Sequence, residues 1–366
     1  MEAKVEQLRK IKLVISDLHL GKGRQLENGG ANPFEEFYYD EKLVEFFQYY
    51  CSGAFRDCEI ELIINGDFLN FLQVDYRGHF LTVLTESVCL EILKTILDGH
   101  PKVFAALREW GQFPNRTITY VMGNHDQAML WPACRQLLNS VLGCQIRFKS
   151  LVYFFEGVHI EHGHMHEAAN RFDPRRFFLK KDLPEPILNL PFGSLFFVEL
   201  VLKIKKKYPF VDKIRPFSRM LRWSLSNQTW MTLSALSQLM VYLLRTGLQK
   251  DPRKRITWRS LGKVVWESTV FPDLGDSARK LLQDSRIHTV IFGHSHVYQY
   301  RQLSLEKEYL NTGTWTEITS LDLISFGKIT KLTYVMVEYF EQSQRPRCRL
   351  KEWKGYHRME EDVVLS

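Results

Sequence analysis

The chain has 366 residues, 45% hydrophobic and 25% charged, a composition typical of globular proteins that excludes a disordered or fibrous chain. Its formal net charge is +7, from 49 Lys and Arg against 42 Asp and Glu. The excess lies between Arg171 and Ser260, where 19 Lys and Arg face 6 Asp and Glu, a local charge of +13, so the other residues carry a net charge of −6. A basic segment inside a mildly acidic chain is typical of proteins that meet an anionic partner.

The cysteines and the N-terminal segment favour a reducing compartment. The six cysteines form no CxxC pair and have no regular spacing, so the sequence predicts neither a disulfide framework nor a zinc ribbon. Residues 1–10 are charged and lead into an apolar strand pattern without the apolar core of a signal peptide. We therefore expect a cytoplasmic protein.

The first part of the chain has an α/β pattern, in which short apolar runs that end in Gly, Asn or Asp alternate with helical periodicity. The predicted strands are Lys12–Ser16, Ile60–Ile64, Thr117–Met122 and Val158–Glu161, and the predicted helices are Asp40–Tyr50, Thr85–Asp98, Val103–Trp110 and Trp131–Val141. We assign residues 11–170 to the first part of a core domain.

After residue 170 the sequence becomes basic, aromatic and rich in proline, with helical periodicity. This change predicts an inserted helical subdomain or lid at 171–280. Predicted strands then resume, at Ile287–Phe292, Glu308–Asn311, Asp322–Ser325 and Lys331–Phe340. They form the second part of the core at 281–340, and a polar, loosely held tail is expected at 341–366.

The longest uncharged stretch, Trp223–Leu244, is long enough to cross a bilayer, which takes about 20 residues. Nine Ser, Thr, Asn and Gln residues interrupt it, however, while its leucines and Met240 recur at helical spacing. The pattern favours a one-sided amphipathic helix over a membrane span.

Oxygen and imidazole donors follow the predicted strands in five short motifs. They are Asp17 and His19 in SDLHLG, Asp67 in NGDF, Asn124, His125 and Asp126 in MGNHD, His162 in EHGH, and His294 and His296 in FGHSH. Open α/β sheets bind ligands at the carboxyl ends of their strands, so we expect these residues to meet at one edge. Seven of these nine residues, namely two carboxylates, one amide and four imidazoles, form a mixed set that suits Mn²⁺, Fe²⁺ or Zn²⁺. Seven ligands exceed the need of one ion, which predicts two metals about 3.5–4 Å apart.

The order of these motifs, DxH, GD, GNHD, HG and GHxH, resembles that of the calcineurin-like metallophosphoesterase superfamily over residues 11–167 and 287–340. The resemblance implies a four-layered α/β/β/α sandwich and phosphoester hydrolysis by in-line attack of a metal-bridging hydroxide. It implies two divalent ions, foremost Mn²⁺, with Asp17, His19 and His296 at the first, Asn124, His162 and His294 at the second, and Asp67 between them. It also implies that His125 protonates the leaving oxygen or stabilises the transition state, and that Asp126 orients His125.

Four further residues are candidates for substrate binding. Asn70 and Arg77 follow the bridging Asp67, His164 lies next to the predicted ligand loop, and Arg171 opens the insertion. An arginine there suits a phosphate. The neighbouring His159 and His166 are expected to be structural or surface residues.

Within the superfamily, SDLHLG and GDFLNF resemble the UDP-2,3-diacylglucosamine hydrolase branch, which cleaves a pyrophosphate in lipid A synthesis and carries a basic, apolar lid between its HG and GHxH motifs. That branch normally has Arg at the position of His125, so the likeness extends to the architecture and not to the substrate pocket. The alternatives are a nuclease or cyclic-nucleotide phosphodiesterase of the same fold, or a catalytically silent interaction scaffold.

The basic segment bears on this choice. Its lysines lie among apolar and aromatic residues, a pattern typical of peripheral contact with an anionic membrane through residues 195–245. Nucleic-acid binding and a solvated charged face stay open as other interpretations. The membrane interpretation is favoured over nucleic acid because a run of long apolar residues, 195–202, precedes the lysines.

Overall fold

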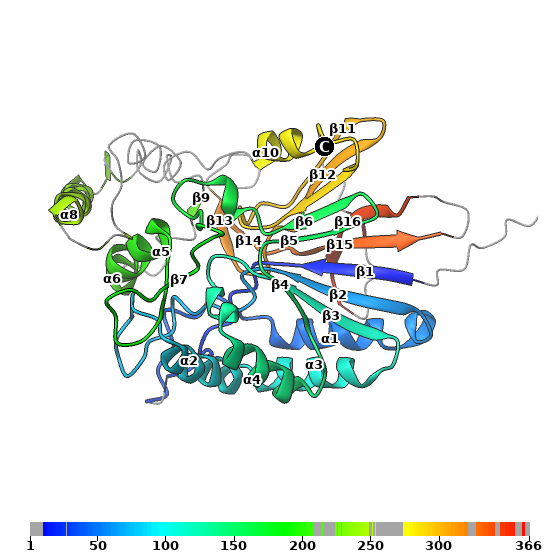
Figure 1. The fold of residues 1–366 in the computed structure, drawn as a ribbon, viewed down its shortest axis with the longest axis horizontal. Coiled ribbons are helices and arrows are strands. Elements are labelled where there is room, and N and C mark those ends of the chain that lie inside the picture. Colours follow the sequence, from blue (N-terminus) through cyan, green and yellow to red (C-terminus); the bar gives the residue numbers. More distant parts are fainter. Residues whose placement is uncertain are drawn as a thin grey trace, which may run out of the picture.

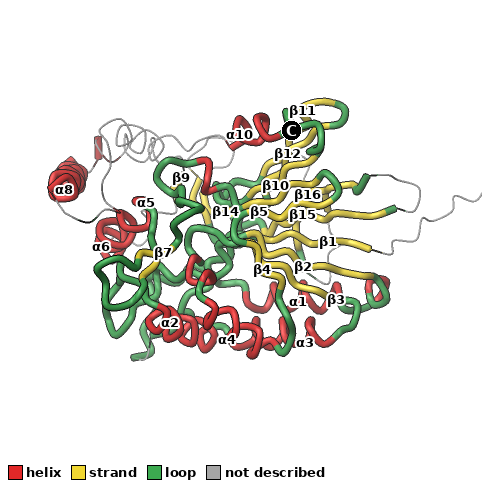
Figure 2. Tube along the Cα trace, viewed as in Figure 1, coloured by secondary structure: helices red, strands yellow, loops and turns green. Residues whose placement is uncertain are grey.

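The computed structural model describes residues 10–26, 28–207, 214–215, 224, 226–227, 229–248, 251, 253, 274–320, 327–340, 345–355 and 361–362. Its centre is formed by two sheets that pack face to face and are covered by helices on their outer sides (Figures 1 and 2).

The larger sheet has the strand order β17-β16-β15-β1-β2-β3-β4. Its strands are β1 (Lys10–Ile15), β2 (Glu59–Asn65), β3 (Arg116–Val121), β4 (Arg147–Lys149), β15 (Leu332–Tyr339), β16 (Arg347–Trp353) and β17 (Glu361–Asp362). Strands β1 to β4 run parallel, so their carboxyl ends lie at one edge, and β15 joins β1 in antiparallel register.

The smaller sheet has the strand order β11-β12-β10-β6-β5. Its strands are β5 (Val152–Phe155), β6 (Val158–Glu161), β10 (Thr289–Phe292), β11 (Gln299–Ser304) and β12 (Lys307–Asn311). Between the sheets, Val14, Ile63 and Val121 of the larger one pack against Ile160 and Ile291 of the smaller one. Both sheet faces at this interface are therefore apolar, and their burial drives the sandwich together.

Helices form the two outer layers. The larger sheet is covered by α1 (Asp40–Tyr50), α2 (Glu86–Gly99), α3 (Pro101–Gln112) and α4 (Pro132–Leu142), and the smaller sheet by α10 (Leu274–Leu281). The side chain of Thr85 caps α2, and a proline occupies the first turn of α3 and of α4. These four layers confirm the predicted α/β/β/α sandwich.

The insertion is helical in its described part, as the sequence predicts. It contains β7 (Phe178–Leu179), β8 (Ile187–Leu188), α5 (Phe192–Phe196), a π-helical turn (Phe197–Val201), α6 (Leu202–Lys207), β9 (Ile214–Arg215) and α8 (Thr229–Leu248). Strand β9 pairs with β13 (Ile318–Ser320), which also pairs with β14 (Gly327–Ile329). The strand expected at Asp322–Ser325 lies outside the described residues.

Helix α8 covers most of the predicted amphipathic stretch. Trp230, Leu233, Met240 and Val241 are exposed along it, whereas Thr232 is buried. Among the described residues, the helices are too short or too polar to span a bilayer.

The expected loose tail is wrong for Arg347–Trp353. This segment forms β16, pairs with β15 over seven residues and buries Cys348, Leu350 and Trp353. Charged residues separate the three apolar ones, so the segment looks polar in sequence, although Cys348 and Leu350 pack between the two sheets and Trp353 packs on the other side of the sheet against Phe46 of α1.

Candidate metal centre

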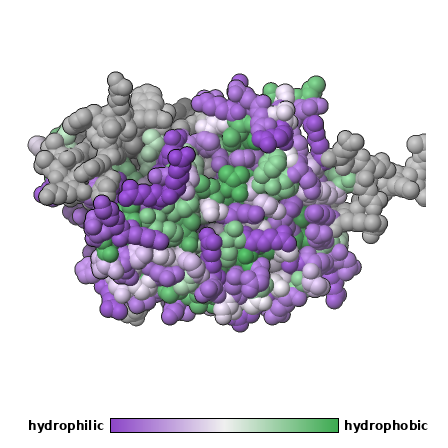
Figure 3. All heavy atoms as spheres, in the orientation of Figure 1, coloured by the Kyte–Doolittle hydropathy of each residue, from purple (hydrophilic) through white to green (hydrophobic). Residues whose placement is uncertain are grey.

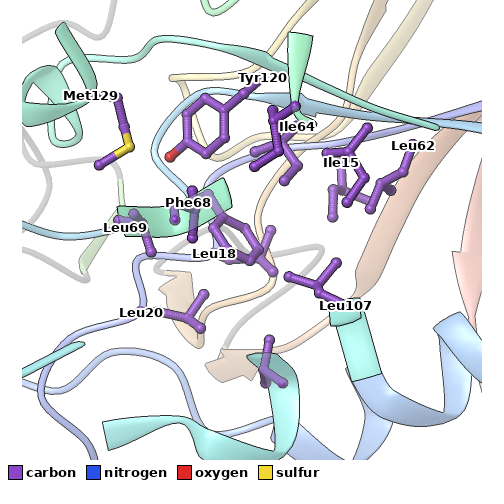
Figure 4. Close-up of a cluster of buried hydrophobic side chains, with 14 of the residues drawn as sticks. Ile15, Leu18, Leu20, Leu62, Ile64, Phe68, Leu69, Leu107, Tyr120 and Met129 are labelled. Atoms are coloured by element: carbon purple, nitrogen blue, oxygen red, sulfur yellow. The ribbon is translucent and has the colours of Figure 1, made fainter. Parts of the chain in front are cut away.

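The loops that leave β1 and β2 run side by side at the carboxyl edge of the larger sheet. His19 N–H donates to Asp67 O over 2.9 Å, and Leu20 N–H donates to Phe68 O over 2.9 Å. The residues beside the ligands, among them Leu18, Leu20 and Phe68, point into the apolar core beneath the loops (Figure 4). Alternation of apolar and ligand residues thus anchors each loop while its polar side chains face the site.

Five of the predicted metal ligands have left-handed backbone conformations. The φ angles of Asp17, His19, Asp67, His294 and His296 lie between 51° and 68°. This region costs a residue other than glycine roughly 1–2 kcal/mol. Such strain persists only where surrounding structure enforces it, and it concentrates at functional sites.

The first predicted ligand group is assembled. Ligand atoms of Asp17, His19 and His296 all lie within 4.8 Å of one another. Nε2 of His19 is 3.0 Å from Nε2 of His296, which in turn is 3.3 Å from Oδ1 of Asp17. Two imidazole nitrogens that face each other beside a carboxylate are arranged to share a cation.

The second predicted group lies beside the first. Ligand atoms of Asp67, His162 and His294 also lie within 4.8 Å of one another, with Oδ2 of Asp67 3.0 Å from Nε2 of His162. The same Asp67 oxygen is 3.9 Å from Nε2 of His19 in the first group. Asp67 therefore lies between the groups, where the predicted bridging ligand belongs.

Asn124 and His162 carry buried polar atoms that suit a metal. Oδ1 of Asn124 has no hydrogen-bond partner, Nε2 of His162 faces the carboxylate of Asp67, and both residues are buried. The loop with Asn124 is held against the bridging residue because the N–H of His125 donates to Oδ1 of Asp67 over 2.7 Å. Since unpaired buried polar atoms are costly, these donors fit two divalent ions, which would be held by the seven residues named in the sequence.

The electrostatics of the site favour positive charge. Burial alone would lower the pKa of His162, but the nearby carboxylates of Asp67 and Asp17 raise it to about 10. Burial opposes ionisation of Asp67 as well, yet His162 and His125 hold its pKa well below the usual value. Two ionised carboxylates out of water need cations beside them, and divalent ions meet that need.

His125 lies beside both groups. Its ring centroid is 4.7 Å from that of His19, and its Nδ1 is 2.9 Å from Oδ1 of Asn70. Burial lowers the pKa of His125 to about 3, so the ring is neutral at pH 7 before a phosphate binds. Asn70, predicted to bind substrate, thus contacts the predicted acid and is itself buried.

Asp126 does not orient His125, contrary to the implication of the resemblance. Its Oδ1 accepts from the N–H of Gly123 over 2.6 Å, and its Oδ2 accepts from the N–H of Phe68 and the hydroxyl of Tyr120. Burial and the charge of Asp67 raise its pKa to about 7. Asp126 joins the two loops that carry the bridging aspartate and the GNHD motif, and Asn70 takes the place expected for it at His125.

The other candidate substrate residues divide into two kinds. His164 is buried among the ligands, 5.5 Å from His162 and 6.3 Å from His294 between ring centroids, and neither of its ring nitrogens has a hydrogen-bond partner. Arg77 is exposed and 3.8 Å from Glu91, and Arg171 donates to Met165 O at the surface. In the described part of the chain, neither guanidinium contacts a metal ligand.

His159 and His166 both lie next to Glu161, away from the ligand groups. Nε2 of His159 is 3.6 Å from that carboxylate, and Nε2 of His166 is hydrogen-bonded to it. Burial of Glu161 opposes its ionisation, but the two histidines lower its pKa to about 2. This cluster agrees with the structural role expected for both histidines.

Two residues that contact the ligand histidines were not predicted from the sequence. The backbone oxygen of Asn65 is 2.9 Å from Nδ1 of His162, and Oε2 of Glu167 is 2.7 Å from Nε2 of His294. Gly123 allows the loops to approach, since a Cβ there would lie 2.2 Å from Oδ1 of Asp67. Glu167 follows no recognisable motif, and only its closeness in sequence to His162 could have indicated it.

The chain was compared with known protein families and solved structures. Solved structures that resemble the chain include a dimetal phosphatase from Danio rerio (12% identity, TM-score 0.37, 98% of this chain and 100% of that chain). They also include Vps29 from Chaetomium thermophilum (10% identity, TM-score 0.32, 98% and 95%) and Zn²⁺-bound Vps29 from Entamoeba histolytica (9%, 0.26, 94% and 99%). No curated protein matches the chain significantly. A family model for the calcineurin-like phosphoesterases matches residues 12–298. The chain belongs to the calcineurin-like phosphoesterase family and is a metal-dependent phosphoesterase.

Proposed function

We propose that the chain hydrolyses a phosphoester or pyrophosphate attached to an apolar, lipid-like group, in the manner of UDP-2,3-diacylglucosamine hydrolysis, with two Mn²⁺ ions. When bound, the ions supply an activated water and neutralise the phosphoryl oxygens. His125, oriented by Asn70, then faces the reacting phosphate as the group that exchanges a proton with the leaving oxygen.

The contact that carries this proposal joins the insertion to His125. The ring of Phe197 lies 5.4 Å from the ring of His125, between centroids. Phe197 belongs to an apolar cluster with Leu72, Val198 and Leu202, against which Phe34 and Phe80 also pack. An apolar surface beside the predicted acid supports a substrate whose leaving group or neighbouring group is apolar.

Surface features of the insertion support contact with an anionic lipid surface. Lys203, Lys206 and Lys207 are exposed on α6, and Trp230 and Met240 are 85% and 60% exposed on α8. Away from the insertion, polar side chains cover much of the face seen in Figure 3, with apolar ones gathered near its middle. Basic residues beside exposed apolar ones favour peripheral binding at a cytoplasmic membrane face.

A Mn²⁺-supplemented substrate panel tests the substrate class. We expect UDP-2,3-diacylglucosamine to be hydrolysed faster than a bis-aryl phosphate or DNA, with release of the acylated sugar phosphate read by mass spectrometry. Phe197→Ala should raise the KM for the acylated substrate by roughly tenfold and leave the KM for the bis-aryl phosphate unchanged, because it removes apolar contact only.

Phe154→Ala is the matched control, since Phe154 is exposed on β5 outside the insertion. Hydrolysis of DNA at a higher rate than every acylated substrate, without lipid or detergent, would contradict the proposal and favour the nuclease alternative. A protein that binds Mn²⁺ but hydrolyses none of the panel would point to another phosphoester class.

A further inference from the structure

We propose that the insertion helices, defined as residues 192–207, support the metal centre and set its affinity for metal. The inference rests on the proposed dinuclear function and adds a role for residues that no ligand motif contains. Three paths of polar contacts, each through at least one intermediate residue, link the insertion helices to three different metal ligands.

The first contact reaches His294. Oε2 of Glu167 is 2.7 Å from Nε2 of His294 and also accepts from Nδ2 of Asn170 over 2.7 Å. A carboxylate that holds Nε2–H fixes the tautomer and leaves Nδ1 of His294 for a metal. Glu167 is buried, so this contact is shielded from solvent.

Helix α5 rests on the same turn. The N–H of Gly193 donates to Ala169 O over 2.7 Å, and a Cβ at Gly193 would lie only 2.3 Å from Oδ1 of Asn170. The absence of a side chain at Gly193 therefore allows α5 to pack directly on the residue that holds Glu167. Movement of α5 would disturb Asn170, then Glu167 and His294.

The second contact reaches Asn124. Nε2 of Gln127 donates to Oγ of Ser194 over 3.0 Å and also to the backbone oxygen of Asn124. Gln127 and Ser194 are each only 2% exposed. The GNHD loop is therefore hydrogen-bonded to α5 inside the protein.

The third contact reaches His19. Lys205 is fully buried, and its Nζ donates to Oε1 of Glu36 over 2.6 Å and to Oε1 of Gln73 over 2.7 Å. The other oxygen of Glu36 is 3.9 Å from Nδ1 of His19. A buried ammonium needs such partners, so α6 is held where Glu36 faces the ligand histidine. Lys205 is therefore a buried anchor and not one of the solvated or membrane-facing lysines expected from the sequence.

The three contacts come from separate positions of the insertion helices and end at ligands of both predicted metals. Linkage is reciprocal, so a conformation of the insertion that favours metal binding is itself favoured by bound metal. The position of the insertion helices is thereby coupled to the metal content of the site. Glu167, Gln127 and Glu36 are positioning residues in this arrangement.

Mn²⁺ titration of metal-free, full-length protein by calorimetry tests the coupling. We expect Glu167→Gln to weaken Mn²⁺ binding about 10-fold to 100-fold, as loss of a carboxylate behind a ligand histidine does. Lys205→Met should weaken it about threefold to tenfold, since Lys205 acts through Glu36. The matched controls are Glu185→Gln and Lys203→Met, whose side chains are exposed in the same insertion.

Hydrogen exchange gives a second measurement. If Glu167 only stabilised the fold, its substitution would not change the effect of Mn²⁺ on exchange in residues 192–207. Mn²⁺ should slow amide exchange in residues 192–207 of the wild-type protein, and less so in Glu167→Gln. If Lys205→Met fails to fold, Glu36→Gln/Lys205→Met removes both buried charges, and Ser194→Ala tests the Gln127 contact separately.

The outcomes separate the two proposals. A wild-type protein that binds fewer than two Mn²⁺ ions contradicts the dinuclear function. If the wild type binds two ions, and folded Glu167→Gln and Ser194→Ala bind Mn²⁺ within twofold of the wild type with unchanged exchange in 192–207, the function stands and the coupling is overturned.

Discussion

The strand-end loops of the core and the insertion both border the metal centre, but they present different kinds of side chain to it. In the loops, buried carboxylates and imidazoles adopt strained backbone conformations above an apolar anchor. In the insertion, apolar rings and exposed lysines flank the same site, and few acidic residues occur. The difference teaches that the core holds the charged groups of the metal centre, whereas the insertion adds apolar and cationic side chains, which our proposal assigns to the substrate.

The largest effect should come from the residue between the two metal groups. Asp67→Asn removes the carboxylate that faces both His162 and His19, so phosphodiester hydrolysis with Mn²⁺ should fall by about 10³-fold or more. Circular dichroism should show a folded protein. Asp182→Asn is the control, because Asp182 has a similar φ of 59° but is exposed. Full activity in Asp67→Asn would contradict a catalytic role for the metal centre of the core.

A smaller loss is expected at the boundary between core and insertion. His125→Ala should lower kcat by about 10²-fold, the range of general acid catalysis, while two Mn²⁺ ions stay bound. The reason is that the ring of His125 lies between the ligand His19 and the insertion residue Phe197. Metal content by mass spectrometry checks the second half of the prediction, with the exposed His79→Ala as control. Loss of metal in His125→Ala would instead show that His125 is a metal ligand.

A structural feature could be predicted from the sequence where the residues that form it are close together in the chain, and could not where they are far apart. The ligands could be predicted because strand, turn and donor residue follow one another in each motif, and the parallel strands bring the ends of the motifs to one edge. The burial of Lys205 could not, because its partner Glu36 is 169 positions away and lysine is ordinarily a surface residue. Strand β16 was not predicted because charged residues separate its apolar ones, and only its pairing with β15 brings Cys348, Leu350 and Trp353 into the core.

The difference between core and insertion can also be seen at two neighbouring residues, Glu35 and Glu36. Glu35 is held from within the core: it accepts from the N–H groups of Gly21 and Gly23, and its Oε2 is 3.5 Å from Nε2 of His100. Glu36, the next residue, is held by Lys205 of the insertion. The first loop is therefore supported on one side by a histidine and on the other by a lysine, and the titration of the histidine allows its side to be tested by pH.

The smallest effect, on stability and not on chemistry, should follow from this difference. Burial opposes the charge of His100, but Asp40 and Glu35 raise its pKa to about 9. A raised pKa stabilises the folded protein fully below the unfolded value of about 6.5, and the stabilisation disappears as the pH rises through 9. The free energy of unfolding in urea should therefore fall by at most about 3 kcal/mol between pH 6.5 and pH 9.5.

In His100→Gln the fall over that range should be absent, while Lys205→Met should retain it, because that variant leaves His100 and its partners Asp40 and Glu35 unchanged. An equal pH dependence in the wild type and in His100→Gln would show that another group supports the first loop from the core side. His100 would then no longer account for the support of Glu35, and the core half of the contrast between Glu35 and Glu36 would have to be assigned to that other group.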